Sequence, residues 1–203
     1  MHVPARDREL IQIMDASFAE AARRAGPHLV CRPGCTQCCH GPFPINALDV
    51  ARLRAGMIQL RTTDSVLAAE VERRAQAWVA TWAADFPGDP ATGILAESDA
   101  ARERFEELAD DAPCPALDPA TGRCDVYAWR PMTCRVFGPP VRMETGALGC
   151  CELCFTNADD NEIAACEMPV PHDLEDDLLE ELGNPTETVV AYALVKSKES
   201  SAR

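Results

Sequence analysis

Apolar residues recur at three- and four-residue spacing along the first part of the chain, and this period predicts an amphipathic helix. The pattern stops at Gly26-Pro27, a pair that ends helices. Its apolar positions are Leu10, Ile11, Met14, Phe18, Ala21, Ala22 and Ala25.

Four further helices are expected from the same period and from capping residues. Asn46 can cap a second helix, a third begins near Asp64, and a shorter one opens at Ser98. An acidic helix spans 173–182, with Gly183 as its stop. The apolar positions are Val50, Leu53, Met57 and Ile58 in the second; Leu67, Val71, Ala75, Trp78, Trp82 and Phe86 in the third; Ala101, Phe105 and Leu108 in the fourth; and Leu174, Leu178, Leu179 and Leu182 in the last.

Between these helices the chain is rich in turn formers, and it carries most of its cysteines there. Residues 31–42 and 113–140 read as loops. The apolar run 188–195 is ambiguous, because its β-branched residues favour a strand and its Ala and Leu favour a helix. We therefore predict a mainly α fold: a single small helical domain, 1–203, wrapped around a cysteine-rich metal-binding core with long loops. Residues 30–40 and 113–154 would be the metal-binding segments, 46–110 a helical insert, and 197–203 a frayed tail.

Composition narrows the function classes. The chain has 203 residues, of which 47% are hydrophobic and only 5% aromatic, which fits one domain with a modest helical core. Its formal net charge is −14, from 33 acidic and 19 basic residues. Nucleic acids and anionic membranes are therefore excluded as main partners, because both need a positive face. An unknown protein or small molecule is the expected partner. No stretch approaches 18 consecutive apolar residues, so no membrane span is expected.

The cysteine content points to metal. The N-terminal residues contain no apolar run followed by a small-residue cleavage site, so we expect a cytoplasmic, reducing location where disulfides are uncommon. Eleven cysteines then need another explanation, and metal ligation is the leading one. The pairs Cys35-x-x-Cys38 and Cys151-x-x-Cys154 allow two sulfurs to reach one metal. Burial as small apolar side chains remains the alternative, above all for Cys166.

The order of these segments resembles the YkgJ-type cysteine-cluster family of zinc- or iron-chelating proteins. Its signature appears as Cys31-x3-Cys35-x2-Cys38-Cys39, followed by Cys114, Cys124-Asp-Val-Tyr127 and Arg130-Pro131-Met-Thr-Cys134. The resemblance implies about eight metal-binding cysteines; the eighth would be Cys150, Cys151 or Cys154. Flagellin lysine N-methylases look like relatives associated with an iron–sulfur cluster. The resulting candidate metal ligands are Cys31, Cys35, Cys38, Cys39, Cys114, Cys124, Cys134, Cys151 and Cys154.

Soft thiolates select zinc or iron–sulfur clusters, and the irregular spacing favours an iron–sulfur cluster over zinc. Adjacent Cys38 and Cys39 are poorly placed to ligate one mononuclear ion together. We predict that one centre joins the first cysteine cluster to Cys114, Cys124 and Cys134. Its use would be a redox or modification role that the sequence does not identify. The alternatives are a zinc-stabilised interaction module whose acidic surface meets a basic partner, and, by family analogy alone, a methyltransferase-like enzyme. A radical S-adenosylmethionine enzyme shares the first cysteine spacing, but here helices follow where that class alternates strands and helices.

Overall fold

The computed structural model describes residues 2–143, 145–183 and 185–195. The chain divides into two compact units. The first contains Gly34–Pro131 and the described residues 2–3, 183 and 185–195, and the second contains Pro4–Pro33 and Met132–Leu182. The predicted tail at 197–203 lies outside the described residues.

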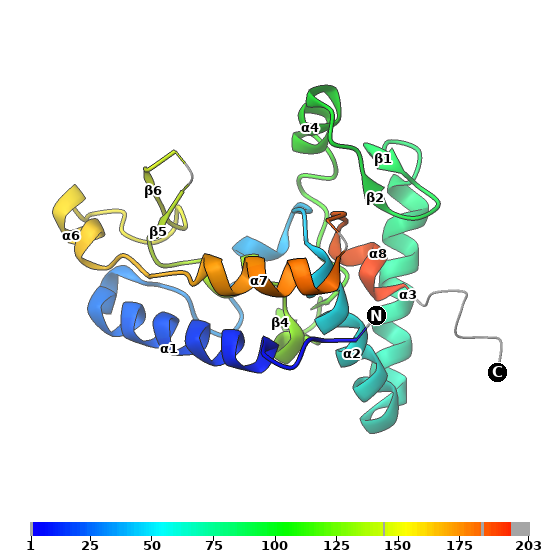
Figure 1. Cartoon of the computed structure of the whole chain (residues 1–203), viewed down its shortest axis with the longest axis horizontal. Coiled ribbons are helices and arrows are strands. Elements are labelled where there is room, and N and C mark those ends of the chain that lie inside the picture. Colours follow the sequence, from blue (N-terminus) through cyan, green and yellow to red (C-terminus); the bar gives the residue numbers. More distant parts are fainter. Residues whose placement is uncertain (1, 144, 184, 196–203) are drawn as a thin grey trace. The chain divides into compact units, whose positions relative to one another are not determined.

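Three helices that pack against one another form the centre of the first unit: α2 (Ala47–Thr63), α3 (Ser65–Trp82) and α8 (Val190–Leu194) (Figure 1). Asn46 caps α2 by accepting hydrogen bonds from the backbone N–H groups of Leu48 and Asp49, and Asp64 caps α3 by accepting one from Leu67. The buried side chains between the helices are Leu53, Met57, Leu60, Val71, Ala75 and Leu194.

The ambiguous run at 188–195 has both conformations. Thr188 pairs with Ile45 in an isolated antiparallel bridge, and two residues later the chain enters α8. The β-branched end thus pairs as a strand, while the Ala- and Leu-rich end is helical.

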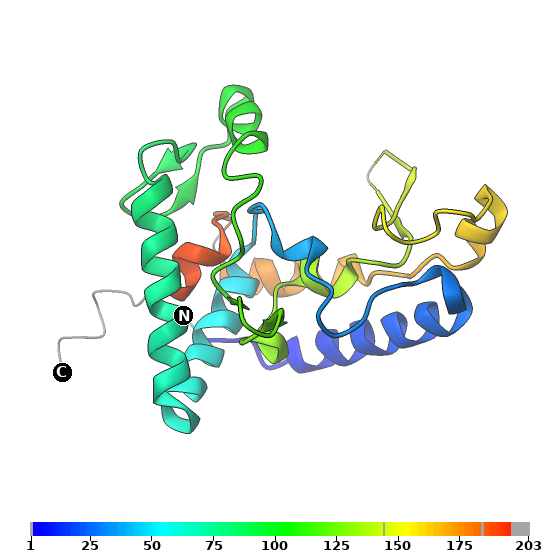
Figure 2. The same ribbon diagram turned by 180° about the vertical axis from the view of Figure 1, so that it is seen from behind.

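Short hairpins and turns complete the first unit. Strands β1 (Gly88–Asp89) and β2 (Ile94–Leu95) pair and are followed by α4 (Asp99–Glu106), which Ser98 caps as predicted. Strands β3 (Leu117–Asp118) and β4 (Arg123–Cys124) form a second hairpin. Of two 3₁₀ turns in this unit, η2 (Gln37–Cys39) carries Cys38 and Cys39, and η3 (Tyr127–Trp129) follows the β3–β4 hairpin; the reverse view shows the backbone of this region (Figure 2).

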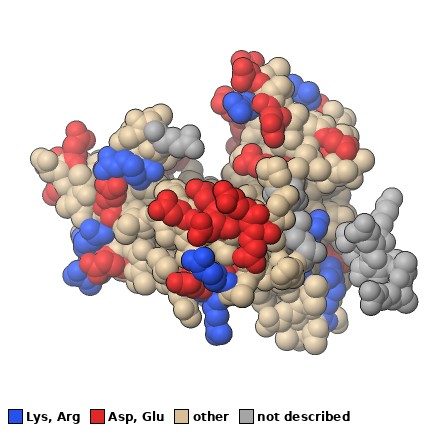
Figure 3. Space-filling view, viewed as in Figure 1, with Lys and Arg blue, Asp and Glu red and all other residues tan. Residues whose placement is uncertain are grey.

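The second unit is built on α1 (Asp7–Ala25), which contacts α5 (Met132–Val136) and α7 (His172–Leu182). A 3₁₀ turn η1 (Gly26–His28) follows α1. Strands β5 (Val141–Arg142) and β6 (Leu148–Gly149) pair, and α6 (Asp160–Ala165) begins with a capping box at Asp159. Acidic side chains gather over α7 (Figure 3).

The mainly α prediction is confirmed, since all paired strands in the described residues are two residues long. Residues 113–140 are not simply a loop: β3, β4, η3 and α5 lie within them. Phe86 lies beyond the end of α3 instead of within it, yet it is buried. Among the described residues, every helix is too short or too polar to cross a membrane.

Candidate metal centre

Backbone hydrogen bonds hold the first cysteine cluster against the segment that carries Cys114. The N–H of Cys114 donates to the carbonyl oxygen of Cys39 at 2.7 Å, and the N–H of Gly41 donates to that of Ala112 at 3.0 Å. His40 and Pro113 form the bridge between these two bonds. The structure therefore joins, across the helical insert, two segments that the sequence places far apart.

The β3–β4 hairpin adds Cys124 to this region. Cys124 lies opposite Leu117 in the register of the hairpin, and the N–H of Asp125 donates to the carbonyl oxygen of Ala116 at 2.8 Å. The hairpin turn is closed by Asp118, whose carboxylate accepts from the Thr121 hydroxyl and the Ala120 N–H.

Four thiols share one electrostatic environment in this unit: the charges of Cys38, Cys114 and Cys124 all raise the pKa of Cys39. The largest cause of that increase is the hydrogen bond in which the Cys39 thiol donates to Cys38. The same bond lowers the pKa of Cys38 to about 6. Cys38 is thus a thiolate at neutral pH, which is the form that binds metal.

The other two thiols are held neutral by burial. Burial raises the pKa of Cys114 to about 12, and it also raises that of Cys124. Arg130 acts in the opposite direction, since its positive charge lowers the pKa of both Cys38 and Cys124. Its guanidinium lies 3.9 Å from the centre of the Tyr127 ring. A bound metal cation would stabilise the thiolate form of all four side chains.

Arg74 of α3 braces the two thiol-bearing segments. It donates to the carbonyl oxygen of Pro115 at 2.8 Å and to the carboxylate of Asp125 at 2.5 Å. Sequence reasoning missed both Arg74 and Asp125. A signal was present, because Arg74 lies in the same i, i+4 row of α3 as Trp78 and Trp82, where a charged residue needs a buried partner.

The remaining candidate ligands fall in different places. Cys35 lies in the first unit, in the loop before η2. Cys31 and Cys134 lie in the second unit, as do Cys151 and Cys154. Cys151 and Cys154 are buried beside Cys166, Ala25 and Phe155 in a hydrophobic cluster. The prediction that one centre includes Cys134 stays a prediction.

None of the eleven cysteines, which all lie in the described residues, forms a disulfide. Within residues 2–143, 145–183 and 185–195, no three or more His, Cys, Asp or Glu side chains are gathered into a group that could hold a metal ion. The residues Cys38, Cys39, Cys114 and Cys124 thus lie on segments joined by backbone hydrogen bonds, but their thiols are not gathered into a coordination shell. Their chemistry fits a thiophilic metal, since the donors are sulfur and one is already ionised.

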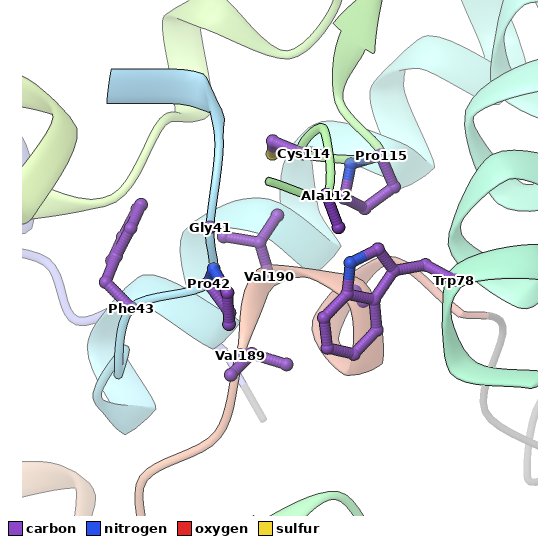
Figure 4. A pocket seen from close by; sticks show the side chains of 10 residues that line it. Gly41, Pro42, Phe43, Trp78, Ala112, Cys114, Pro115, Val189 and Val190 are labelled. Atoms are coloured by element: carbon purple, nitrogen blue, oxygen red, sulfur yellow. The ribbon is translucent and has the colours of Figure 1, made fainter. Parts of the chain in front are cut away.

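Cys114 also borders open space. Trp78, Ala112, Cys114 and Pro115 line a small crevice together with residues 41–43 and 189–191 (Figure 4). The same four residues line a larger groove of about 700 Å³ between α3 and residues 107–119. We call this larger space the α3 groove.

Thiol-bearing loops held by short helices define a cysteine-cluster protein, and the comparison with known families agrees. Residues 30–167 match the family model CxxCxxCC, described as "putative zinc- or iron-chelating domain", and the chain belongs to this family. The resemblance predicted from the cysteine signature is confirmed. No curated protein and no solved structure matches the chain.

Proposed function

We propose that the protein binds an iron–sulfur cluster at a centre formed in the first unit by Cys38, Cys39, Cys114 and Cys124, with Cys35, in the loop before η2, as a further candidate ligand. The observation that carries this proposal is the backbone hydrogen bond from Cys114 to Cys39, which joins the first cysteine cluster to the segment that leads into the Cys124 hairpin. These side chains come from two loops and a hairpin, so a bound centre would link segments that are remote in sequence.

The irregular spacing of the candidate ligands along the chain, with a long gap between Cys39 and Cys114, supports a cluster over a single ion. One zinc ion requires four donors around a single point, whereas a cluster offers several irons to thiolates that are further apart. Metal binding would require the thiols to rotate toward the centre and to lose their remaining protons.

We also place the protein in a reducing compartment, the cytoplasm, because its thiols must stay reduced to act as ligands. The cluster would supply electron-transfer or Lewis-acid chemistry. The arrangement of Arg130 beside Cys38 and Cys124 would offset part of the negative charge of a thiolate-ligated cluster.

The test is metal analysis of protein purified without oxygen. We expect brown protein, broad absorbance near about 400 nm, and iron and acid-labile sulfide in equal amounts. Colourless protein that contains zinc and no sulfide would overturn the cluster in favour of a zinc-stabilised module. The cells should be grown in medium supplemented with both iron and zinc, so that a shortage of one metal does not decide which metal the protein contains.

A further inference from the structure

The α3 groove has an aromatic and apolar floor. Trp78 and Trp82 are four residues apart on α3 and lie on the same helical face. Leu117, Pro115 and Pro119 line the opposite side. A groove of about 700 Å³ lies within the range of about 300–1,000 Å³ that is typical of ligand-binding sites.

The positive charges along the groove are already neutralised. Arg73 makes two hydrogen bonds to the carboxylate of Glu70, at 3.0 and 2.6 Å. Arg74 is paired with Asp125 and is only 14% exposed. Neither guanidinium is therefore available to attract an acidic ligand.

The negative charges along the groove are not neutralised. Glu107, Asp110 and Asp111 line it, and all three residues are exposed. Within the part of the chain that the structure describes, none of these carboxylates forms an ion pair. The groove thus combines tryptophan faces with three uncompensated carboxylates, which is the combination that binds organic cations through cation–π and ionic contacts.

Trp78 adds a hydrogen-bond donor. Its side chain is buried, with the residue only 8% exposed, and Figure 4 shows its ring nitrogen on the side that faces Ala112 and Pro115. Within the part of the chain that the structure describes, this N–H has no hydrogen-bond partner, and it is not among the fully buried polar atoms, so it retains contact with solvent. A peptide carbonyl oxygen in the groove would replace that contact with a hydrogen bond.

We propose that the α3 groove binds a basic peptide segment of a partner protein, with an arginine or lysine side chain over the half-buried Trp82 ring and beside the edge of Trp78. The cation would face Glu107, Asp110 and Asp111, and the peptide backbone would accept from the Trp78 indole. This inference depends on the groove residues alone and not on the identity of the metal. It gives the acidic chain a defined docking site, with Cys114 at its inner wall.

The experiment uses the full-length protein as purified, with an acetylated and amidated hexapeptide that alternates arginine and alanine. The readout is the set of indole N–H resonances, because the chain has only three tryptophans. We expect the signals of Trp78 and Trp82 to shift on titration. Trp129 is the internal reference, since it does not line the groove and packs on Gly56 of α2.

Two double variants with the same change of charge make the test specific. Glu107→Gln with Asp110→Asn removes two groove carboxylates, and Asp176→Asn with Glu180→Gln removes two exposed ones on α7. The loss of two exposed ion pairs should weaken peptide binding about three- to tenfold. We expect this weakening only in the groove variant. All four substitutions are at exposed positions, so both proteins should fold and retain equal metal content.

Several outcomes would overturn the proposal. If both double variants bind the peptide more weakly to the same extent, the peptide is attracted by the net charge of −14 and not by the groove. Equal binding of a twin peptide with citrulline in place of arginine would show an apolar groove without cation recognition. Arginine amide that binds as tightly as the hexapeptide would make it a small-cation site. Absence of any shift in the Trp78 and Trp82 signals would reject the groove altogether.

Discussion

Arg74 donates to the carboxylate of Asp125 at 2.5 Å, and this ion pair connects α3 to the hairpin that carries Cys124. The side chains are 14% and 11% exposed, so neither charge is fully solvated. The second contact of Arg74, to the carbonyl oxygen of Pro115, fixes the residue that follows Cys114. One guanidinium thus contacts both of the backbone segments that carry the candidate ligands Cys114 and Cys124.

We expect Arg74→Gln to lower the free energy of unfolding by about 2–4 kcal/mol, because Asp125 would be left as a largely buried carboxylate without its partner. Urea denaturation measures this change, and iron content per chain should fall with it. Arg73→Gln is the matched control: its partner Glu70 is 43% exposed, so the loss should be much smaller than that of Arg74→Gln. Equal effects of the two substitutions would refute the bracing role.

Local signals in the sequence were sufficient for the helices. The capping side chains Asn46, Asp64 and Ser98 begin α2, α3 and α4 as predicted. Gly183 follows α7 with a φ of 62°, a left-handed conformation that glycine adopts without strain. These signals can be read because a cap and its partner lie within three residues of each other.

Contacts between segments that are remote in sequence were harder to predict than the helices. The cysteine signature predicted that the first cluster meets Cys114 and Cys124, but nothing periodic indicates that the Cys114 N–H donates to Cys39. The helical row of Arg74 indicates that it needs a partner but not that the partner is Asp125. Hydrogen bonds between loops leave no trace in spacing or hydropathy. The same reason explains why the assignment of Cys31 and Cys134 to a unit other than that of Cys35 could not be foreseen.

Gly56 allows α2 to approach the segment that links Cys124 to Cys134. A Cβ atom there would lie 2.4 Å from the ring of Trp129. Gly56→Ala would gain about 1 kcal/mol of helix propensity, but relief of the overlap should cost about 1–3 kcal/mol. We therefore expect no stabilisation or a net loss in thermal unfolding. The double variant with Trp129→Leu should show the propensity gain relative to Trp129→Leu alone, and a stabilised Gly56→Ala single variant would contradict the close packing.

The hydrogen bond between Cys39 and Cys38 predicts unusual reactivity of the metal-free protein. The pKa of Cys38 is about 6, below the ordinary value of about 8.5. Cys38 should therefore react with iodoacetamide at pH 7 faster than a thiol in the urea-unfolded chain, as followed by peptide mass analysis. Cys39→Ala removes the donor and should slow the reaction, whereas Cys39→Ser keeps a hydroxyl donor and should preserve much of it.

The same shift predicts how the stability of the metal-free protein depends on pH. Between about pH 6 and 8.5 the unfolded chain keeps the Cys38 proton that the folded chain has lost, so the Cys38 contribution to stability rises with pH in this window. It is fully present above the ordinary pKa and is lost as pH falls through about 6. The pKa of Cys39 is raised, so its contribution is lost at higher pH, above about 8.5. Urea midpoints for the wild type and Cys39→Ala, measured from pH 5.5 to 8.5, should diverge as pH rises; parallel curves would show that the thiols are uncoupled.

Ligand substitutions define how far the centre extends. Cys114→Ser and Cys124→Ser should lose metal as severely as Cys38→Ser, because each removes one ligand of the proposed centre from the segments that backbone hydrogen bonds join. Cys166 is buried in a hydrophobic cluster of the second unit, so Cys166→Ser should retain most of the metal. The sequence also predicts that Cys134→Ser loses metal about as severely as Cys35→Ser. Iron and sulfide per chain, measured after anaerobic purification, distinguish these cases. Full metal content in Cys134→Ser would confine the centre to thiols of the first unit, and full content in Cys114→Ser would refute the centre itself.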